Sequence, residues 1–435
     1  MLSQVSVRNF KAIGGKSVTL DLAPLTLIVG PNAAGKSSML DAIVLMAQST
    51  RPPQWTGLLT NGARQTFGPV ENLYHRCDPT NAMRIELRWA RRDSTPVGAW
   101  FEVANAKTGD PGEWKQGLAA GNSAIRFENM PGSVQAYAAF NGKVDGKVTV
   151  GGSVQRFLDP GLLNAASQSQ AEQLAPWRDD VAERLAAFLT STQLRYIGPM
   201  RGGSVMKLDA QGVAAQAGRF GEDTIRLLST VELRVDPERR QWLKATAERF
   251  GLSDLTAGFA GDGTLGARFS DPRTHASLPV TSAGFASQQL LPILADLAHL
   301  KSGGTLLVEE IEHSTHPAWI AALGATLAEA VADLDTQIVA TTHAPDLLLS
   351  AALAVKERVI GPEALAIWEM TRDAAGVRAR RWNVDSKGRF EEGWVQSFAA
   401  AEKSLLGKLL EEDAKAEANG NKPKRRTAPR SARSR

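Results

Sequence analysis

The sequence predicts an α/β protein in which a mixed, mainly parallel sheet is flanked by helices, with an antiparallel β lobe and a helical lobe added. Apolar runs alternate with helical patterns near residue 25 and from residue 282 onward, an order typical of parallel sheets. Between 83 and 150, alternating apolar and polar residues are broken by Gly, Pro and Asn, which indicates antiparallel strands. Amphipathic patterns at 169–192 and 221–250 indicate the helices of the second lobe.

These patterns divide the chain into five expected parts. Strands that pair with one another are expected within 2–29, and a helix is expected to follow residue 36. Strand-like runs return at 254–281, and closing strands with a final helix are expected at 363–400. The five parts are the first half of the core (1–82), an antiparallel β insert (83–150), a helical and β lobe (151–281), the second half of the core (282–402), and a helix end with a basic tail (403–435).

The composition is that of an ordinary globular chain that carries a basic tail. Apolar residues make up 43% and charged residues 22% of its 435 residues, enough for a sizeable core. The net charge is +4, but residues 422–435 alone hold seven Lys or Arg and no acid, so the rest is net negative. The tail is expected to be disordered, and it serves either as a nucleic-acid arm or as a solubilising terminus.

Cysteine usage and hydropathy narrow the class of protein. Cys77 is the only cysteine, which excludes internal disulfides and zinc sites built from several cysteines. No apolar run approaches the roughly 18 residues that span a membrane, and no signal-peptide pattern opens the chain. We therefore expect a cytoplasmic protein with no membrane partner.

Residues 30–38, GPNAAGKSS, match the phosphate-binding pattern G-x-x-x-x-G-K-[ST]. An apolar strand pattern precedes the motif and a helical pattern follows it, which is the context that the motif requires. Backbone N–H groups in such a loop surround phosphate, helped by the helix dipole. Lys36 is predicted to reach the β- and γ-phosphates of ATP, and Ser37 to bind Mg²⁺. The predicted nucleotide-binding residues are Gly30, Pro31, Asn32, Ala33, Ala34, Gly35, Lys36, Ser37 and Ser38.

Two further strand patterns end in polar residues suited to nucleotide hydrolysis. TLLVEEIE ends in Glu309 and Glu310, at the carboxyl end of a strand, where a parallel sheet binds its ligands. We expect Glu309 to hold Mg²⁺ through water and Glu310 to polarise the attacking water. His343 follows the next strand, where it could contact the γ-phosphate or that water. The alternatives are a solvated acidic turn and a histidine that caps the next helix or packs in the sheet.

A second phosphate-binding element is expected at TSAGFASQQLLPIL, where Ser282 and Gly284 precede an apolar helix. The N-terminus of a helix binds anions through its free amide groups. One chain cannot easily bring this helix and its own P-loop to the same phosphate, so we expect both residues to serve the P-loop of a second copy. The alternative is an ordinary helix that Ser282 caps.

The order of P-loop, Ser-x-Gly helix, Glu-Glu strand and His strand resembles that of the ABC-type ATPases. Within them the chain is similar to the soluble SMC, RecF and OLD-like branch, in its opening VSVRNFKAI, in YIGPMRGG at 196–203 and in EEIEHSTHP at 309–317. The resemblance covers residues 1–400, and the middle only loosely. It implies an ABC-type P-loop NTPase head that binds ATP and Mg²⁺ and forms a homodimer or a higher homo-oligomer.

Several positions depart from the family pattern or leave a role open. Ile311 stands where proline is usual, and Ser-Ala-Gly replaces Ser-Gly-Gly-Gln. Either Gln288 or Gln289 substitutes for the missing glutamine, or neither does. Arg201 is expected to contact a phosphate or a partner, or to form a structural ion pair. The glutamine that senses Mg²⁺ has two candidates, Gln48 and Gln65, and the alternative for each is a surface polar residue.

The predicted function is ATP binding and hydrolysis with nucleotide-gated dimerisation, acting in DNA repair, DNA maintenance or anti-phage defence. OLD-like proteins often carry a Toprim nuclease domain, and nothing after His343 resembles one. A nuclease or toxin would then be a separate protein. The alternative is a slowly hydrolysing scaffold or sensor that holds and releases such an effector. DNA is a further candidate partner.

Overall fold

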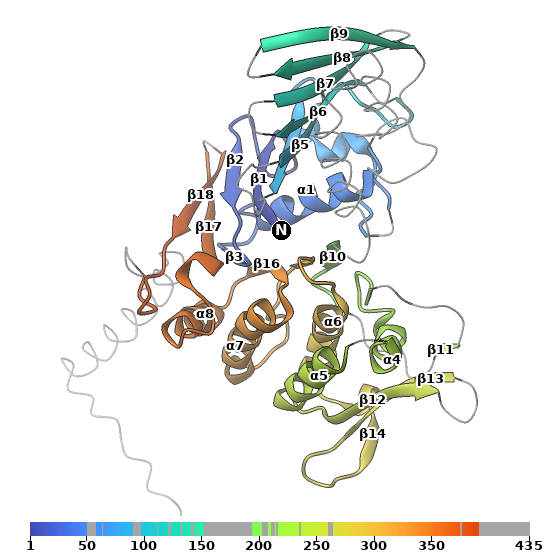
Figure 1. Cartoon of the computed structure of the whole chain (residues 1–435), viewed down its shortest axis with the longest axis vertical. Coiled ribbons are helices and arrows are strands. Elements are labelled where there is room, and N and C mark those ends of the chain that lie inside the picture. Colours follow the sequence, from blue (N-terminus) through green and yellow to red (C-terminus); the bar gives the residue numbers. More distant parts are fainter. Residues whose placement is uncertain are drawn as a thin grey trace, which may run out of the picture. The chain divides into compact units, whose positions relative to one another are not determined.

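Three sheets organise the part of the chain that the structure describes (Figure 1). The predicted site residues follow the carboxyl ends of β3, β15 and β16, which are inner strands of the six-stranded sheet. The residues that the computed structural model describes all lie in one unit, Met1–Glu391, and residues 391–435 lie outside the description. The described residues are 1–49, 58–62, 64–89, 97–110, 112–120, 123–130, 133–140, 143–151, 194–201, 208–209, 214, 216–234, 236–259, 264–374 and 376–390.

A six-stranded sheet forms the centre of the fold, in the order β10-β15-β16-β3-β17-β18. The first five strands are parallel, and only β18 runs antiparallel, beside β17. The inner strands are fully buried apolar runs, as expected for a parallel sheet covered on both faces. The bounds are β10 Leu194–Ile197, β15 Thr305–Val308, β16 Gln337–Thr342, β3 Leu25–Val29, β17 Leu365–Asp373 and β18 Gly376–Trp382.

Helices connect these strands, and their alternation with the strands confirms the α/β prediction. Helix α1 (Lys36–Ser49) follows β3, and α6 (Phe285–His299) precedes β15. Helix α7 (Pro317–Leu334) joins β15 to β16, and α8 (Pro345–Lys356) joins β16 to β17. By length and hydropathy α7 could cross a membrane. In the fold it packs against α8 and buries a row of apolar residues beside the sheet, which accounts for its composition.

An antiparallel sheet of eight strands contains the predicted β lobe, in the order β2-β1-β4-β5-β6-β7-β8-β9. Strands β1 and β2 pair as expected, but β3 was wrongly grouped with them, because it lies in the central sheet. The antiparallel sheet also crosses the expected boundary after residue 82, since β1 pairs with β4. The bounds are β1 Leu2–Arg8, β2 Val18–Asp21, β4 Met83–Trp89, β5 Val97–Ala104, β6 Glu113–Ala120, β7 Ser123–Met130, β8 Ser133–Phe140 and β9 Lys143–Gly151.

A small third sheet and two helices surround α6. The helices are α4 (Thr224–Arg234) and α5 (Pro237–Arg249), and both lie within the region where two were predicted. Asp236 caps α5 by accepting from the N–H of Glu238, directly before a proline at the first helical position. The strands are β11 Leu208–Asp209, β12 Ser253–Phe259, β13 Thr264–Ser270 and β14 Ser277–Pro279. The helices expected at 169–192 and at the end of 363–400, and the basic tail, lie outside the described residues.

Candidate functional site

The P-loop connects β3 to α1, and its backbone conformation requires glycine at two positions. Gly30 has φ +141°, and a Cβ there would lie 2.1 Å from the carbonyl oxygen of Met370 on β17. Gly35 has φ +95° and Ala33 has φ +61°, values that L-residues rarely adopt. The loop therefore has the tight turns that the phosphate-binding motif predicted.

Lys36 is folded onto the loop that it follows. Its side chain is almost fully buried, and Nζ donates to the carbonyl oxygens of Gly30 at 2.9 Å and Pro31 at 3.0 Å. Burial lowers the pKa of Lys36, while nearby carboxylates, Glu310 foremost, oppose that shift. The ammonium group thus lies inside the predicted phosphate cradle, bonded only to neutral oxygens.

Ser37 and Glu309, the two predicted Mg²⁺ ligands, contact each other directly. Ser37 Oγ donates to Glu309 Oε2 at 2.9 Å, although the residues are 272 positions apart in the chain. The hydroxyl of Tyr196 donates to Glu309 Oε1 at 2.7 Å. Glu309 is 6% exposed, and its burial raises its pKa, with a further rise from Asp41. Paired hydroxyl and carboxylate oxygens beside a phosphate cradle suit Mg²⁺.

A buried polar network surrounds this pair, and most of it was missed by sequence reasoning. Gln65 Nε2 donates to Asp41 Oδ1 and to the Tyr196 hydroxyl, each at 3.2 Å, and Lys11 Nζ lies 2.6 Å from Asp41 Oδ2. Gln48 donates to the backbone carbonyls of Leu59 and Gln65. Both glutamines are buried, so the alternative of surface polar residues is wrong. Of the two, Gln65 reaches the Glu309 network, and Gln48 holds a loop.

Glu310 differs from its neighbour in both conformation and exposure. Its φ is +44°, and its backbone N–H donates to the Thr341 hydroxyl at 2.9 Å. The carboxylate is 43% exposed and lies 3.7 Å from His313 Nδ1. The next residue, Ile311, is fully buried, and its N–H donates to the carbonyl of Thr341 at 3.1 Å. A proline at this position could not make that bond, which gives the departure from the family pattern a structural reason.

His343 lies in the same group of charges. Its backbone N–H donates to Glu312 Oε1, and the imidazole interacts electrostatically with Lys36 and Glu310. Burial, with the charge of Lys36, lowers the pKa of His343, which favours the neutral ring at neutral pH. The N-cap of α8 is Ala344, without a side-chain bond, so His343 does not cap that helix. Glu312 had no predicted role.

Arg201 is bonded to the protein backbone and not to a carboxylate side chain in the described residues. Its guanidinium donates to four backbone carbonyls, those of Gly198 at 3.1 Å, Glu309 at 3.0 Å, Glu310 at 3.0 Å and Ile311 at 3.3 Å. The side chain is 1% exposed, and burial lowers its pKa to about 10. Among the described residues Arg201 therefore bonds backbone oxygens and forms no structural ion pair, and its contact with a phosphate or a partner stays a prediction.

The predicted second phosphate element is exposed and uncapped. Ser282 ends a short 3-10 turn, and the N-cap of α6 is Gly284 with no side-chain bond, so the alternative of a Ser282 cap is wrong. A Cβ at Gly284 would meet open space. Gln288 donates to the carbonyls of Thr281 and Ala283, and Gln289 donates to that of Arg201. In the described part of the chain, no hydrogen bond joins Ser282 or Gly284 to the P-loop.

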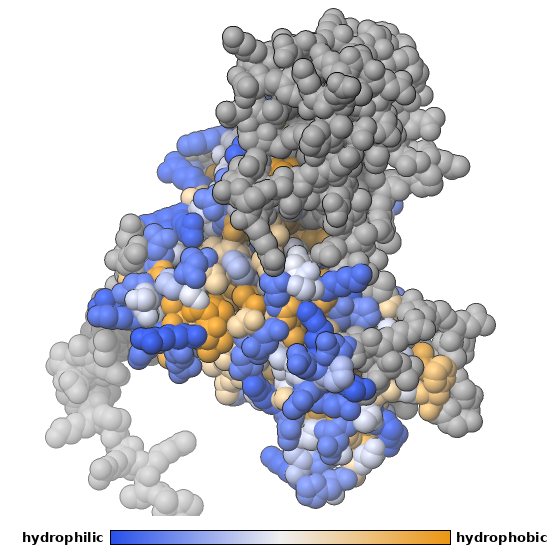
Figure 2. All heavy atoms as spheres, in the orientation of Figure 1, coloured by the Kyte–Doolittle hydropathy of each residue, from blue (hydrophilic) through white to orange (hydrophobic). Residues whose placement is uncertain are grey.

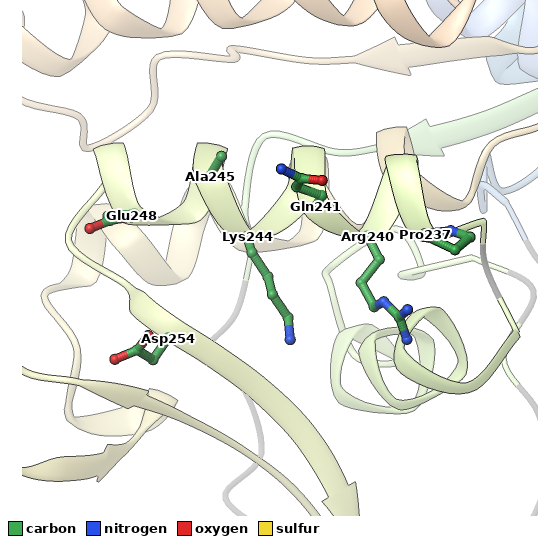
Figure 3. Close-up of a pocket in the computed structure, with 7 residues that line it drawn as sticks. All are labelled: Pro237, Arg240, Gln241, Lys244, Ala245, Glu248 and Asp254. Carbon is green, nitrogen blue, oxygen red and sulfur yellow. The ribbon is translucent and has the colours of Figure 1, made fainter.

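Other surface features carry none of the predicted site residues. A hollow beside α5 is lined by charged side chains of both signs, including Arg240, Lys244, Glu248 and Asp254 (Figure 3). An apolar patch lies in the region of α8, where Leu349 and Leu353 are exposed (Figure 2). Within the described ranges, no three His, Cys, Asp or Glu residues cluster so as to hold a metal by themselves. A magnesium site here would need phosphate or water oxygens as further ligands.

Comparisons with known proteins agree with this arrangement. Residues 1–94 match the family model described as "AAA ATPase domain". Residues 183–350 match the model described as "AAA domain, putative AbiEii toxin, Type IV TA system". A curated relative, the chromosome partition protein Smc of Methanocaldococcus jannaschii, is 38% identical over 77 residues. That match covers 16% of this chain and 6% of the relative, so this chain spans only a small part of the relative's length.

Solved structures with a similar arrangement include three SMC heads. The SmcHead bound to the C-winged helix domain of ScpA has TM-score 0.47 at 10% identity and covers 88% of this chain and 98% of its own. The SMC head domain from Thermotoga maritima has TM-score 0.41 at 13% identity, covering 87% and 98%. The Pyrococcus furiosus head with an extended coiled coil, bound to the C-terminal domain of ScpA, has TM-score 0.46 at 12% identity, covering 95% and 99%.

The two segments that match ATPase family models both contribute residues to the candidate site. Both models include residues of the proposed site, with the P-loop in the first and the Glu-Glu and His strands in the second. The structure joins these segments through the bond from Ser37 to Glu309. Two segments of the chain thus match ATPase family models, as expected for a P-loop ATPase.

Proposed function

We propose that the chain binds ATP with Mg²⁺, hydrolyses it, and associates with a second copy while ATP is bound. The observation that carries the proposal is the 2.9 Å bond between Ser37 Oγ and Glu309 Oε2. This bond joins the phosphate-binding loop to the acidic strand, as a hydrolytic site requires. A glycine-rich turn with no ligand would not need a buried carboxylate beside its first helical turn.

Each residue of the site has a distinct role in this proposal. The loop amides and Lys36 would hold the β- and γ-phosphates, and Ser37 and Glu309 would hold Mg²⁺, which neutralises phosphate charge when bound. Glu310 would accept a proton from the water whose oxygen attacks the γ-phosphorus, as the bond to the bridging oxygen breaks and ADP leaves. His343, neutral and close to Lys36, would donate to the γ-phosphate.

The association of two copies is proposed from the exposed N-terminus of α6. Open space surrounds Gly284, and no side chain caps the helix. A phosphate on the P-loop of a second copy would meet the amide groups there and the Ser282 hydroxyl. Similarity to a chromosome partition protein and to a toxin–antitoxin family supports DNA maintenance or defence as the setting of this activity.

The test is the mass in solution of the Glu310→Gln protein, with and without ATP and Mg²⁺, measured beside hydrolysis by the wild type. We expect both proteins to assemble with ATP and only the wild type to turn over. Glu363→Gln, at a position far along the chain from the acidic strand, is the control and should behave as wild type. Equal hydrolysis by Glu310→Gln and wild type would remove Glu310 from the mechanism. A fixed oligomer with slow turnover in both would instead favour the scaffold or sensor that holds an effector.

A further inference from the structure

The conformation of Glu310 needs support from outside its own turn. A glutamate at φ +44° lies in a region that non-glycine residues seldom occupy. Such a conformation persists only when the surrounding structure holds it, and it is typical of residues with a functional role. Thr341 supplies part of that support, since its hydroxyl and carbonyl accept the N–H groups of Glu310 and Ile311.

Arg201 supplies the other part, by donating to three consecutive carbonyls, those of Glu309, Glu310 and Ile311. The planar guanidinium has several donors in fixed directions, so one side chain can hold the whole turn. A lysine at the same position would have one nitrogen and no such fork. The turn is therefore fixed from both sides, by Thr341 and by Arg201.

A second buried arginine shows that this arrangement is unusual. Arg195, on β10, is fully buried and forms an ion pair with Asp296 at 2.6 Å, which compensates its charge. Arg201 is equally buried, but its hydrogen bonds go only to neutral carbonyls. An arginine without a hydrogen-bonded carboxylate costs more to bury than one in a close ion pair. Fold stability alone does not explain Arg201, whereas a role in the site does.

Arg201 is also connected to α6. The buried Gln289, on the first turns of α6, donates to the backbone carbonyl of Arg201. Its neighbour Gln288 donates to the carbonyls of Thr281 and Ala283, just before Gly284 begins the helix. The exposed turn at the start of α6 is thus bonded to Gln288, and the next residue, Gln289, is bonded to Arg201. Arg201 in turn bonds the turn of Glu310.

We propose that Arg201 is a positioning residue that holds Glu310 in its working conformation, and that Gln289 links this support to the N-terminus of α6. The proposal rests on the role proposed above for Glu310. Arg201 itself does not touch the nucleotide. Its effect should therefore appear in turnover and not in nucleotide affinity, and it should depend on the presence of Glu310.

The experiment compares Arg201→Lys with Arg195→Lys, a conservative change at a buried arginine that we assign to the fold. Nucleotide affinity, turnover at saturating ATP and melting temperature are measured for each. For Arg201→Lys we expect turnover to fall about 10- to 100-fold, as for a misplaced catalytic group, with affinity within about 3-fold of wild type. Arg195→Lys should lower the melting temperature and leave turnover of the folded fraction unchanged.

A double variant separates positioning from a general structural role. Arg201→Lys should have no further effect on the residual hydrolysis rate of Glu310→Gln, measured with enzyme in excess over ATP, because the residue acts through Glu310. An equal additional loss in that background would overturn the proposal, as would wild-type turnover in Arg201→Lys. If Glu310→Gln itself hydrolyses ATP normally, the role proposed for Glu310 is wrong, whatever Arg201→Lys does. If Glu310→Gln is impaired and Arg201→Lys is not, only the role proposed for Arg201 is wrong.

Two milder variants keep the test decisive if Arg201→Lys does not fold. Thr341→Val removes the hydroxyl that accepts the N–H of Glu310, and Gln289→Leu removes the bond to the Arg201 carbonyl. Both should lower turnover about 3- to 10-fold without a matching change in nucleotide affinity. Wild-type turnover in both variants would contradict the proposal.

Discussion

The two halves of the proposed site differ in how far their side chains are already paired. In the P-loop half, Lys36 bonds the loop carbonyls, and Ser37 and Tyr196 both donate to Glu309. In the acidic turn, Glu310 is 43% exposed, and one oxygen of Glu312 is buried without a hydrogen-bond partner. The first half is closed on itself, whereas the second presents charge that the protein does not neutralise.

This difference separates binding from turnover. A ligand that enters the P-loop half must replace internal bonds with its own, so a change there alters affinity. In the acidic turn the Glu310 carboxylate makes no hydrogen bond that a ligand would have to replace, and in the proposal it acts on charge that develops during the reaction. Variants in the first half should therefore alter the concentrations of ATP and Mg²⁺ that are needed, and variants in the second should alter the rate.

The largest expected effect follows the change Lys36→Met. The ammonium group is the one cation that we place in the phosphate cradle, so nucleotide affinity should fall at least about 100-fold. The unliganded protein should unfold at a similar or higher temperature, since a buried ammonium bonded only to carbonyls stabilises it little. Calorimetric titration with ADP measures the affinity, and Lys301→Met, at an exposed lysine, is the control. Retained affinity in Lys36→Met would contradict the assignment of the cradle.

The next largest effect is expected for His343→Ala, in the half that controls turnover. Loss of the imidazole should lower turnover about 10- to 100-fold and leave nucleotide affinity within about 3-fold. Because its lowered pKa keeps His343 neutral, the neutral amide in His343→Gln should recover part of the rate. Rapid-quench measurements at saturating ATP give the rate. A loss confined to affinity would place His343 in the binding half instead.

Local sequence patterns predicted one part of this site well. The P-loop and the helix after it are fixed by neighbouring residues, so nine contiguous residues were enough to predict their conformation. The strand that precedes the loop was also found, but its partners were not. Strand β3 pairs with β16 and β17, more than 300 residues away, and a local pattern carries no information about such pairing.

The support of the site could not be predicted for the same reason. Tyr196 and Arg201 act through carboxylate and carbonyl groups more than 100 residues away. Their only signal was the segment YIGPMR itself, which the family resemblance singled out without giving roles. Ser282 was a good N-cap by residue type, but the N-cap lies two residues later, at Gly284, and the helix begins at Phe285. Residue type alone does not determine where a helix starts.

A smaller effect is expected for Tyr196→Phe, which removes one donor to Glu309 and leaves Ser37. The lost bond corresponds to about 1 kcal/mol, so the Mg²⁺ concentration at half-maximal turnover should rise several-fold. Turnover at saturating Mg²⁺ should stay at the wild-type value, since Glu310 is untouched. Activity measured against Mg²⁺ concentration at fixed ATP tests this. A lower plateau with an unchanged Mg²⁺ requirement would show that the two halves are not separable.

The smallest effect concerns the fold outside the site, at His299 near the end of α6. Burial and Arg195, whose Nη2 lies 2.8 Å from Nδ1, lower the pKa of His299 to about 4. The unfolded chain takes up a proton near pH 6.5, so this contribution to stability is complete above that pH and is lost as the pH falls toward 4. Since the ring is only half-buried, the loss at pH 5 should be at most about 1 kcal/mol.

His299→Asn keeps an acceptor for Arg195 and removes the titration, so its stability should change less between pH 7 and pH 5 than that of the wild type. Urea unfolding at the two pH values measures this difference. The variant also sharpens the comparison between the two halves of the site. If the ATPase of His299→Asn declines with acid as the wild-type enzyme does, the decline arises in the site. If the decline disappears, the fall in ATPase activity at acid pH arises in α6, the helix that carries Gln289 and His299. Acid would then act on the side chains that support the turn of Glu310, and not on the site itself.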